Sequence, residues 1–450
     1  MTSSPDHVTD HRGARDRLVR IPQPRARLRA RVLRRSILPR LVASVAGGRL
    51  EVRLPDGTTL AGGSGDDRAP HAVIEVTDAR AIAQVAARGN RGFGEAFVLG
   101  WWTSPDPAAA VEVIARSLAH ARSRGVLRLL ATVQRLLPTW QRRSSIRSAR
   151  RDISYHYDLG NDFYCEILDG SMTYSCAEFA PGSDDLLDAQ LAKYEGICRR
   201  LAISADDHVL EIGCGWGGFA EHVARTRGAR VTAVTISSEQ YAFARERIRA
   251  AGLEQLVEVL FLDYRLLQGS FSRIVSIEML EAVGAREYPR FVRTVERLLA
   301  PDGQACVQVI GFQDRDYERQ LRTRGWIRRY VFPGGMLPTP TVLTRVMTRE
   351  TDLQLHGVRE LGMHYGPTLR AWRERLLAAA DRLDVAGYGA RLRRSWEFYL
   401  AYCEGGFRAG HIRVMQLFLA HAGTVAAPHD ADRHAIDPGG TAFATGVPSS

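Results

Sequence analysis

The chain has 450 residues, a formal net charge of +11 and an apolar share of 45%. Because this length exceeds that of one average domain, we expect a core domain with at least one accessory domain. The apolar share excludes a largely disordered chain. The sequence contains no run of roughly 18 apolar residues, so we expect no membrane-spanning helix. No apolar run with a cleavage site follows the basic residues of the N-terminus, so we expect no secretory signal.

Six cysteines are scattered along the chain without a CxxC pair or a ligand-spaced histidine cluster. We therefore expect neither a disulfide framework nor a metal site, and a reducing cytoplasm fits this pattern. The cysteines are Cys165, Cys176, Cys198, Cys214, Cys306 and Cys403.

Residues 1–45 are interpreted as a basic arm. Between residues 11 and 40 lie eleven arginines and a single acid, Asp16. Such a stretch favours polyanions, and each basic residue near an anionic membrane surface contributes about 1 kcal/mol. We expect peripheral attachment to the inner face of the cell membrane, and a basic tail without any partner is the alternative.

A smaller N-terminal α+β domain is predicted for residues 46–140. Apolar and polar residues alternate around Asp56 and Gly57, which is typical of a β-hairpin. A charged linker follows at 141–152, and residues 424–450 are predicted to be a disordered tail rich in Gly, Pro, Ala and Ser. The expected elements of the small domain are a hairpin at 49–60, a strand at 71–76, a helix at 79–87, an aromatic segment broken by glycines at 92–102 and a helix at 108–136.

Residues 153–423 are predicted to form the main domain. Strand and helix patterns alternate from residue 205 to 310, which is typical of an α/β fold with a doubly wound parallel sheet. Ligands of such sheets bind beyond the carboxyl ends of the strands, near the switch point. The predicted strands are 208–212, 230–235, 257–262, 273–277 and 304–310, and the predicted helices are 218–227, 238–250 and 288–299.

A glycine-rich loop follows the first of these strands directly and opens a helix. Glu211 precedes Gly213, Gly215 and Gly217, which let the backbone turn tightly and approach a ligand. The spacing differs from the GxGxxG of dinucleotide sites, where a diphosphate rests on the helix N-terminus. An acidic residue beside the loop suits a ligand that carries ammonium and sulfonium charges. The loop therefore predicts an enzyme that uses S-adenosylmethionine to transfer a methyl group.

Several longer segments together resemble one known family. They are YHYDLGNDFY at 155–164, MTYSCAEF at 172–179, EIGCGWGGF at 211–219, VTISSEQ at 234–240, VSIEMLEAVG at 275–284, YVFPGGMLP at 330–338 and HYGPTLRAWRER at 364–375. Between about residues 92 and 413 the chain resembles the cyclopropane-fatty-acyl-phospholipid synthase family. The resemblance implies a Rossmann-like class I methyltransferase domain and a lipid-associated N-terminal domain.

The resemblance also implies which residues contact S-adenosylmethionine. One segment, at Tyr174 and Ser175, matches a part of the family's fold that closes over the cofactor. The other contacts come from the glycine loop and from the ends of the next two strands. The expected contacts are Tyr174, Ser175, Glu211, Gly213, Cys214, Gly215, Gly217, Thr235, Ile236, Gln240, Tyr264 and Arg265.

Members of the family methylate the cis double bond of an unsaturated acyl chain in a phospholipid. Methyl transfer to an alkene leaves a carbocation, so the site should be apolar, dry and lined with aromatic faces. Each aromatic candidate could instead be an ordinary core residue. The candidates are Tyr174, Phe179, Trp326, Tyr330, Phe332 and Tyr365.

In the family, a bound bicarbonate beside the cation removes the final proton. The matching positions here are Cys176 and Ile310, through their backbone, and Glu281, Gln308 and Tyr365, through their side chains. Gln308 stands where the family usually has histidine, and a glutamine cannot carry a charge or relay a proton. The fate of the proton is therefore open, and Glu281 has an alternative role as the cap or ion-pair partner of a neighbouring helix.

Two departures from the common family pattern, Gln308 and Ala282, resemble the branch that makes precursors of tuberculostearic acid. In that branch the cation undergoes a hydride shift and then loses a proton, which gives a 10-methylene chain. We expect this product, and ring closure to a cyclopropane is the alternative. The sequence leaves open whether a partner reductase acts on the product and whether the chain forms a homo-oligomer.

Two rival classes of protein remain. A nucleic-acid methyltransferase would suit the basic arm, but amino-methylating enzymes of that class carry an Asn/Asp-Pro-Pro-aromatic tetrapeptide that this sequence lacks, so no nucleic acid is expected as a partner. A catalytically inactive lipid-binding homologue is the second rival. The presence of Glu211 and Glu281 argues against it.

Overall fold

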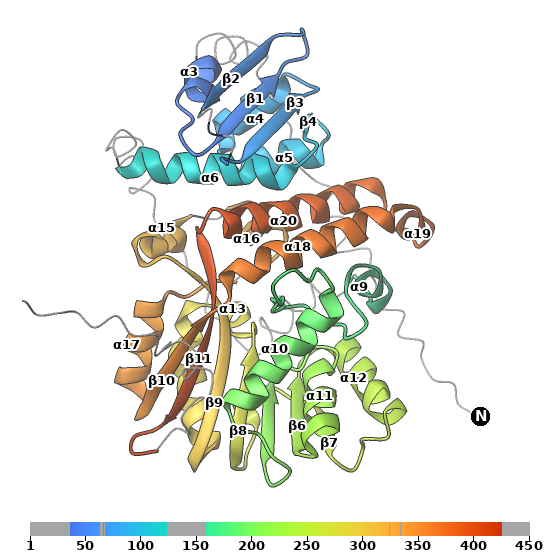
Figure 1. Cartoon of the computed structure of the whole chain (residues 1–450), viewed down its shortest axis with the longest axis vertical. Helices are drawn as coiled ribbons and strands as arrows, with labels where there is room; N and C mark the ends of the chain where they lie inside the picture. Colours follow the sequence, from blue (N-terminus) through green and yellow to red (C-terminus); the bar gives the residue numbers. More distant parts are fainter. Residues whose placement is uncertain are drawn as a thin grey trace, which may run out of the picture.

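The computed structural model describes residues 37–63, 66, 68–123, 159–323, 325–333 and 335–424. Within these ranges a small domain, a layer of helices and a large sheet domain lie one above the other (Figure 1). The predicted linker, residues 1–36 of the predicted arm and residues 425–450 of the predicted tail lie outside them. No helix in this part of the chain combines the length and the apolar character needed to span a bilayer.

The main domain is built on a seven-stranded sheet with the order β10-β11-β9-β8-β5-β6-β7. β5 to β9 pair in parallel, as predicted. The prediction omitted β10 and β11; because β11 pairs antiparallel with both of its neighbours, it runs against the rest of the sheet. The strands are β5 (His208–Ile212), β6 (Arg230–Thr235), β7 (Val257–Phe261), β8 (Phe271–Ile277), β9 (Leu299–Phe312), β10 (Leu353–Glu360) and β11 (Ile412–His421).

Helices cover both faces of this sheet (Figure 1). α11 and α12 pack on β6 and β7, whereas α14 contacts β9 and α17 contacts β10. The central strands are apolar on both sides because each face is covered by helices, which is the usual pattern of a parallel sheet. The helices of this part are α10 (Leu186–Arg200), α11 (Gly218–Arg227), α12 (Ser238–Ala250), α13 (Leu280–Val283), α14 (Tyr288–Leu298), α15 (Tyr317–Arg322), α16 (Trp326–Tyr330) and α17 (Pro340–Glu350), with short 3-10 turns at Tyr264–Leu266, Ala285–Glu287 and Asp314–Asp316.

The small domain has a four-stranded sheet with the order β2-β1-β3-β4. The predicted hairpin is confirmed, since β1 and β2 pair antiparallel around a turn in which Gly57 has a φ of 81°. A strand at His71–Val76 is confirmed as well. The elements are α3 (Leu38–Ala43), β1 (Arg49–Arg53), β2 (Thr59–Gly63), β3 (His71–Val76), α4 (Arg80–Arg88), α5 (Asn90–Val98), β4 (Trp102–Thr103) and α6 (Pro107–Ser123).

The glycines of segment 92–102 suggested a broken segment, but Gly92 and Gly94 lie in the continuous helix α5. Gly100, with a φ of 74°, lies in the turn between α5 and β4. A Cβ atom at Gly92 would lie 2.1 Å from the backbone oxygen of Gln84, and one at Gly94 would lie 2.5 Å from the Trp326 ring. These glycines are therefore explained by close packing of α5 against its neighbours rather than by an interruption of the helix.

A layer of helices lies between the small domain and the carboxyl ends of the strands (Figure 1). Its long members, α18 and α20, pack against each other, and α20 also packs on α5 and α6 of the small domain. The helices of the layer are α9 (Asn161–Ile167), α18 (Gly362–Ala378), α19 (Ala380–Val385) and α20 (Ala390–Arg408).

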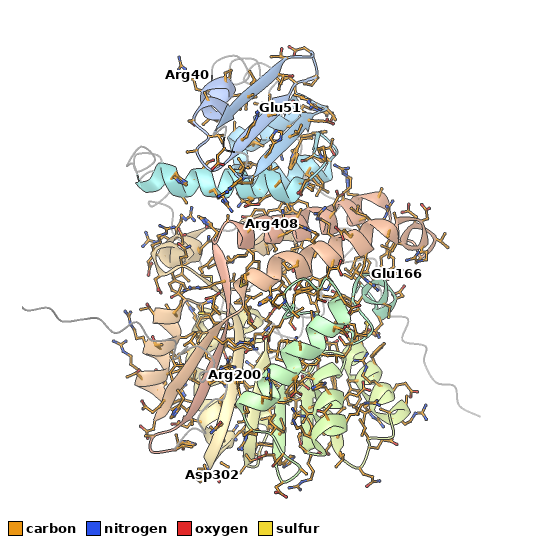
Figure 2. The ribbon with its side chains drawn as sticks, viewed as in Figure 1. Arg40, Glu51, Glu166, Arg200, Asp302 and Arg408 are labelled. Carbon is orange, nitrogen blue, oxygen red and sulfur yellow. The ribbon has the colours of Figure 1, made fainter. Side chains whose placement is uncertain are left out.

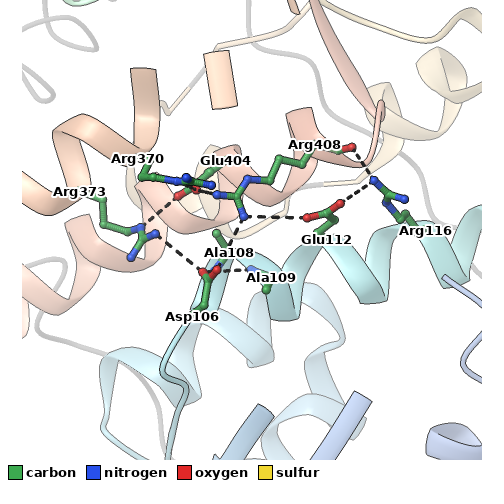
Figure 3. Close-up of polar contacts among 9 residues, drawn as sticks. All are labelled: Asp106, Ala108, Ala109, Glu112, Arg116, Arg370, Arg373, Glu404 and Arg408. Atoms are coloured by element: carbon green, nitrogen blue, oxygen red, sulfur yellow. Dashed lines mark hydrogen bonds and ion pairs between the residues drawn. The ribbon is translucent and has the colours of Figure 1, made fainter. Parts of the chain in front are cut away.

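An ion-pair network fastens this layer to the small domain (Figure 3). The fully buried Glu404 of α20 accepts hydrogen bonds from Arg373, at 3.0 Å, and from Arg408. Both arginines also approach Asp106, which precedes α6, at 3.7 Å. Arg408 lies at the boundary between the two layers (Figure 2). The network holds α20 and the start of α6 in a fixed relation.

Candidate functional site

A pocket opens at the carboxyl ends of β5, β6, β7 and β8. It includes the position where the strand order reverses, between β5 and β8, which is where ligands bind in such sheets. Asp302 lies at the opposite end of the sheet (Figure 2). The pocket therefore lies where the sequence predicted a ligand site, beyond the carboxyl ends of the parallel strands.

All twelve residues expected to contact the cofactor lie near this pocket, and all but one of them line it. The exception is Gly217, which is the N-cap residue of α11. The eleven lining residues are Tyr174, Ser175, Glu211, Gly213, Cys214, Gly215, Thr235, Ile236, Gln240, Tyr264 and Arg265.

The glycine loop needs its glycines. Gly213, Gly215 and Gly217 have φ values of 84°, 53° and 83°, a region that residues with a side chain rarely adopt. A Cβ atom at Gly213 would also lie 2.6 Å from the side chain of Met279, which is another lining residue of the pocket. Because Gly213 and Gly215 have no side chain, a ligand in the pocket can approach the backbone of the loop closely.

Glu211 is the penultimate residue of β5 and lines the pocket. The residue is 3% exposed, and its Oε2 atom is buried without a hydrogen-bond partner. Burial raises the pKa of this carboxyl to about 8, and the nearby ammonium of Lys193 opposes the shift. A buried acceptor that lacks a partner is costly, so the site is suited to a cationic ligand group such as the ammonium of S-adenosylmethionine.

The ends of the next two strands are held by local hydrogen bonds. Thr235 donates to the side chain of Gln240 at 2.9 Å, and Gln240 donates its backbone N–H to the Ser237 hydroxyl, which caps α12. The expected contact Arg265 forms an ion pair with Asp263 at 2.6 Å. Asp263, which lies two residues after the end of β7, also lines the pocket.

Lys193 is a site residue that sequence reasoning missed. It lies on α10, is fully buried, and donates from Nζ to the hydroxyl of Ser175 at 2.8 Å. Burial lowers its pKa to about 8, while the charge of Glu278 opposes this shift most strongly. The lysine therefore ties the segment at Ser175 to α10 and places an ammonium group next to the pocket.

Glu278 is the second missed residue, and it lies at the centre of the expected catalytic cluster. Its Oε1 atom accepts hydrogen bonds from the backbone N–H of Cys176 at 2.9 Å and from the side chain of Gln308 at 2.8 Å. Its Oε2 atom accepts from the hydroxyl of Tyr365 at 2.7 Å. Three of the five groups expected to surround bicarbonate thus converge on a carboxylate of the chain itself.

Glu281 and Ile310 make a separate contact beside this cluster. The backbone N–H of Ile310 donates to Oε1 of Glu281, and Oε2 of Glu281 is buried without a partner. Burial and the neighbouring charge of Glu278 raise the pKa of Glu281 to about 8. Burial also raises the pKa of Glu278, but three hydrogen bonds and Lys193 act against the shift. Of the two carboxyl groups, Glu278 therefore has more groups around it that stabilise a negative charge.

The predicted aromatic residues fall into two groups. The hydroxyl of Tyr174 donates to that of Tyr399 at 2.9 Å, Phe332 packs edge-on against Tyr399 at 5.9 Å, and Tyr365 stacks on Phe407 at 4.4 Å. These rings, with Trp372 and Trp396, form an aromatic cluster that links the helical layer to the pocket.

Trp326 and Tyr330 do not belong to the aromatic cluster. Trp326 packs on Phe398 and against α5, and Tyr330 donates to Glu95 of the small domain at 2.7 Å. These contacts favour the alternative interpretation, ordinary core, for both residues. Phe179 is partly buried near this core, and its backbone N–H donates to His364.

Comparisons with known proteins agree with this geometry. Residues 144–417 match the model of the family described as mycolic acid cyclopropane synthetase. The chain is 37% identical to the tuberculostearic acid methyltransferase UfaA1 of Mycobacterium tuberculosis, over 83% of this chain and 88% of that protein. It is 34% identical to the cyclopropane-fatty-acyl-phospholipid synthase of Escherichia coli (strain K12), over 76% and 86%.

Solved structures show the same fold. The cyclopropane synthase MmaA2 of Mycobacterium tuberculosis superposes with a TM-score of 0.57 and 28% identity, covering 60% of this chain and 98% of that one. The mycolic acid cyclopropane synthase CmaA1, solved with SAH and CTAB, has a TM-score of 0.54 and 27% identity, covering 60% and 97%. The Rossmann-like class I methyltransferase fold predicted from the sequence is confirmed.

Proposed function

The chain belongs to the mycolic acid cyclopropane synthetase family and is an S-adenosylmethionine-dependent C-methyltransferase of unsaturated fatty acyl chains, and from this premise we propose its substrate and product. The substrate is a phospholipid whose acyl chain contains a cis double bond. The product is a 10-methylene acyl chain, the precursor of a tuberculostearic-type branch.

The aromatic cluster is the observation that carries the proposal. S-adenosylmethionine supplies the methyl group, and its transfer to a carbon–carbon double bond leaves a cation on the acyl chain. Aromatic faces attract a cation, and an apolar enclosure keeps water from quenching it. The rings of Tyr174, Tyr365 and Phe332 meet both needs beside the cofactor pocket.

The residues of the pocket bind and orient the methyl donor. Glu211 offers its buried carboxyl group to the ammonium, and the glycine loop brings its backbone close to the ligand. Lys193 fixes Ser175, next to Tyr174, so the segment between the cofactor pocket and the aromatic cluster is held in place. Positioning of this kind is what a weakly nucleophilic alkene requires.

Two features support the methylene branch over ring closure. The relative named for tuberculostearic acid matches most of the chain, and Gln308 replaces the histidine common in the family. The methylene product requires a hydride shift from the methylated carbon to its neighbour before a proton leaves. Ring closure to a cyclopropane is the second candidate, because the E. coli relative carries that name.

The arginine-rich arm supports peripheral attachment to an anionic membrane surface, where the acyl substrate lies. Eleven arginines within residues 11–40 provide the charge. Purified protein should bind vesicles of phosphatidylglycerol at low salt and dissociate as salt rises, and a chain lacking residues 1–36 should bind them more weakly. If the complete chain ignores anionic vesicles at low salt, peripheral attachment through the arm is wrong.

Expression in a bacterial host that makes oleoyl and vaccenoyl phospholipids tests the product. Mass spectrometry should reveal acyl chains one methylene unit heavier. Because the methylene and cyclopropane products have the same mass, proton NMR of the purified acyl chains must separate them: alkene protons indicate the methylene, and strongly upfield ring protons indicate the cyclopropane. Cyclopropane alone would refute the methylene branch, and unaltered lipids together with an absence of S-adenosylmethionine binding would favour an inactive homologue.

A further inference from the structure

We propose that Glu278 is the proton acceptor of the reaction and that its carboxylate occupies the place expected for bicarbonate. This inference rests on the proposed function, because it assigns the last step of methyl transfer to an acyl chain. It makes the proton acceptor a permanent part of the protein rather than a dissolved anion.

The donors around Glu278 form an anion site that the side chain already fills. Cys176 and Gln308 donate to Oε1 at 2.9 and 2.8 Å, and Tyr365 donates to Oε2 at 2.7 Å. A bicarbonate using the same donors would overlap the carboxylate, and the two negative charges would repel each other. The residues present therefore do not fit a bound bicarbonate.

The orientation of Gln308 explains why a glutamine is sufficient at this position. Its Oε1 atom accepts a hydrogen bond at 3.0 Å from the side chain of Gln416, which directly faces it across the β9–β11 pair. That bond turns the Gln308 amide nitrogen toward Glu278. Since the anion is part of the chain, a neutral donor of fixed direction can hold it, and a residue that carries charge is unnecessary.

The backbone at Glu278 is held in an unusual conformation. Its φ is 52°, in the left-handed region that residues with side chains seldom adopt. The backbone N–H of Glu278 donates to the carbonyl oxygen of Gln308 at 2.8 Å, which keeps the residue at the end of β8. This conformation points the carboxylate into the donor cluster, and strain of this kind is commonly stored at functional sites.

Glu278 also lies at the junction of the two parts of the site. It lines the cofactor pocket, whereas its donor Tyr365 stacks on Phe407 within the aromatic cluster. The carboxylate is therefore placed between the methyl donor and the region suited to the acyl cation. A general base must lie within reach of the proton that it removes, and Glu278 is the charged group at this junction.

The step balances without any further reagent. The π electrons of the alkene form the new bond to the methyl carbon while the bond from that carbon to the sulfonium sulfur breaks, its electron pair stays on sulfur, and the adjacent alkene carbon becomes cationic. A hydride then moves to that carbon from the methylated one, which becomes the cation. A C–H bond of the added methyl breaks, its electron pair forms the exocyclic double bond, and its proton passes to a carboxylate oxygen of Glu278, which later releases it to solvent.

A bicarbonate-dependence assay on three proteins tests this role. Wild type, E278Q and E278G are assayed for methylated phospholipid in buffers purged of carbon dioxide, then with sodium bicarbonate or sodium formate added. Wild type should keep its turnover without bicarbonate, and both variants should lose about 100-fold or more. Glycine tolerates the positive φ at position 278, so E278G should fold and leave space for a free anion. Added bicarbonate or formate should then replace the missing carboxylate and restore turnover. Glu166→Gln, which removes a surface carboxylate paired with Arg382, is the matched control with unchanged turnover.

Calorimetric binding of S-adenosylmethionine and thermal unfolding of each variant show whether the protein remains folded and loaded. Wild type that needs added bicarbonate, or E278Q that turns over like wild type, would overturn the role of Glu278 while leaving the proposed function intact. Wild type that binds the cofactor but methylates no phospholipid under any condition would overturn the proposed function, and the role of Glu278 with it.

Discussion

The hydroxyl of Tyr365 donates a hydrogen bond of 2.7 Å to Oε2 of Glu278. Tyr365 belongs to α18, in the helical layer, and Glu278 directly follows β8, in the sheet. This bond joins the two halves of the site, one of which carries the aromatic cluster and the other the cofactor pocket. It also favours the ionised form of Glu278, because a carboxylate accepts a hydrogen bond more strongly than a neutral carboxyl group does, so the bond from Tyr365 acts to lower the Glu278 pKa.

Tyr365→Phe should reduce turnover roughly tenfold while leaving S-adenosylmethionine affinity unchanged. The variant loses one hydrogen bond to a charged group, worth about 1.5–3 kcal/mol, but keeps the ring that stacks on Phe407. Tyr402→Phe, which loses a hydrogen bond with Asn90 outside the site, is the control. Steady-state kinetics at saturating cofactor measure the effect, and equal losses in both variants would show that Tyr365 has only a structural role.

The pH profile of turnover should have an acid limb above the ordinary glutamate pKa of 4.5, because burial raises the pKa of Glu278 and only the ionised form accepts a proton. Lys193, Glu281, Tyr365 and Cys176 face this carboxylate. Loss of the Tyr365 hydrogen bond should raise the pKa further, so the limb should move to higher pH in Tyr365→Phe. A limb that stays in place would contradict the coupling.

Glu281→Gln should make stability less dependent on pH. The folded pKa of Glu281 is raised to about 8 from 4.5, so its contribution to stability is fully present below pH 4.5 and is lost as the pH rises toward 8. Glutamine has no proton to lose and can still accept from Ile310. Urea unfolding at pH 5 and pH 8 should show a smaller decrease in the variant than in wild type. An identical decrease would mean that Glu281 is ionised in the folded protein.

Glu211→Gln should weaken S-adenosylmethionine binding roughly 10- to 100-fold, because a charge-assisted hydrogen bond contributes about 1.5–3 kcal/mol. The unpaired Oε2 atom of Glu211 is the acceptor that the ligand ammonium would satisfy. Isothermal titration calorimetry measures the affinity directly. Unchanged affinity would remove Glu211 from the cofactor site.

Glu404→Gln should destabilise the fold by about 3 kcal/mol, because it leaves Arg373 and Arg408 without their fully buried partner. Glu166→Gln breaks an ion pair whose arginine is well exposed, and it should change stability little. Urea unfolding of the two variants compares a buried pair with a surface pair. Similar losses would mean that the network in Figure 3 does not hold the small domain to the helical layer.

The cofactor half of the site could be predicted from local sequence. A strand, the loop from Glu211 to Gly217 and a helix are contiguous, so the chemistry of the ligand can be read from one segment. The strands β10 and β11 were missed because they lie outside the contiguous segment of alternating strands and helices. They join the sheet only through pairing, β11 with β9 and β10 with β11.

Glu278 was missed for a related reason. Its partners Cys176, Gln308 and Tyr365 come from three distant segments, and only the folded chain brings them to one carboxylate. Glu281, three residues away, has the same chemistry and matched the family pattern better. Lys193 was missed because a single lysine on a helix is usually exposed, whereas this one is fully buried.

The most direct test uses the purified chain, an oleoyl phospholipid and S-adenosylmethionine with a trideuterated methyl group, in buffer purged of carbon dioxide. The account predicts a 10-methylene acyl chain that keeps two of the three deuterons, because Glu278 removes the third from the transferred methyl group. Mass spectrometry counts the deuterons and proton NMR identifies the product. A product that retains all three deuterons, or no product until bicarbonate is added, would contradict it.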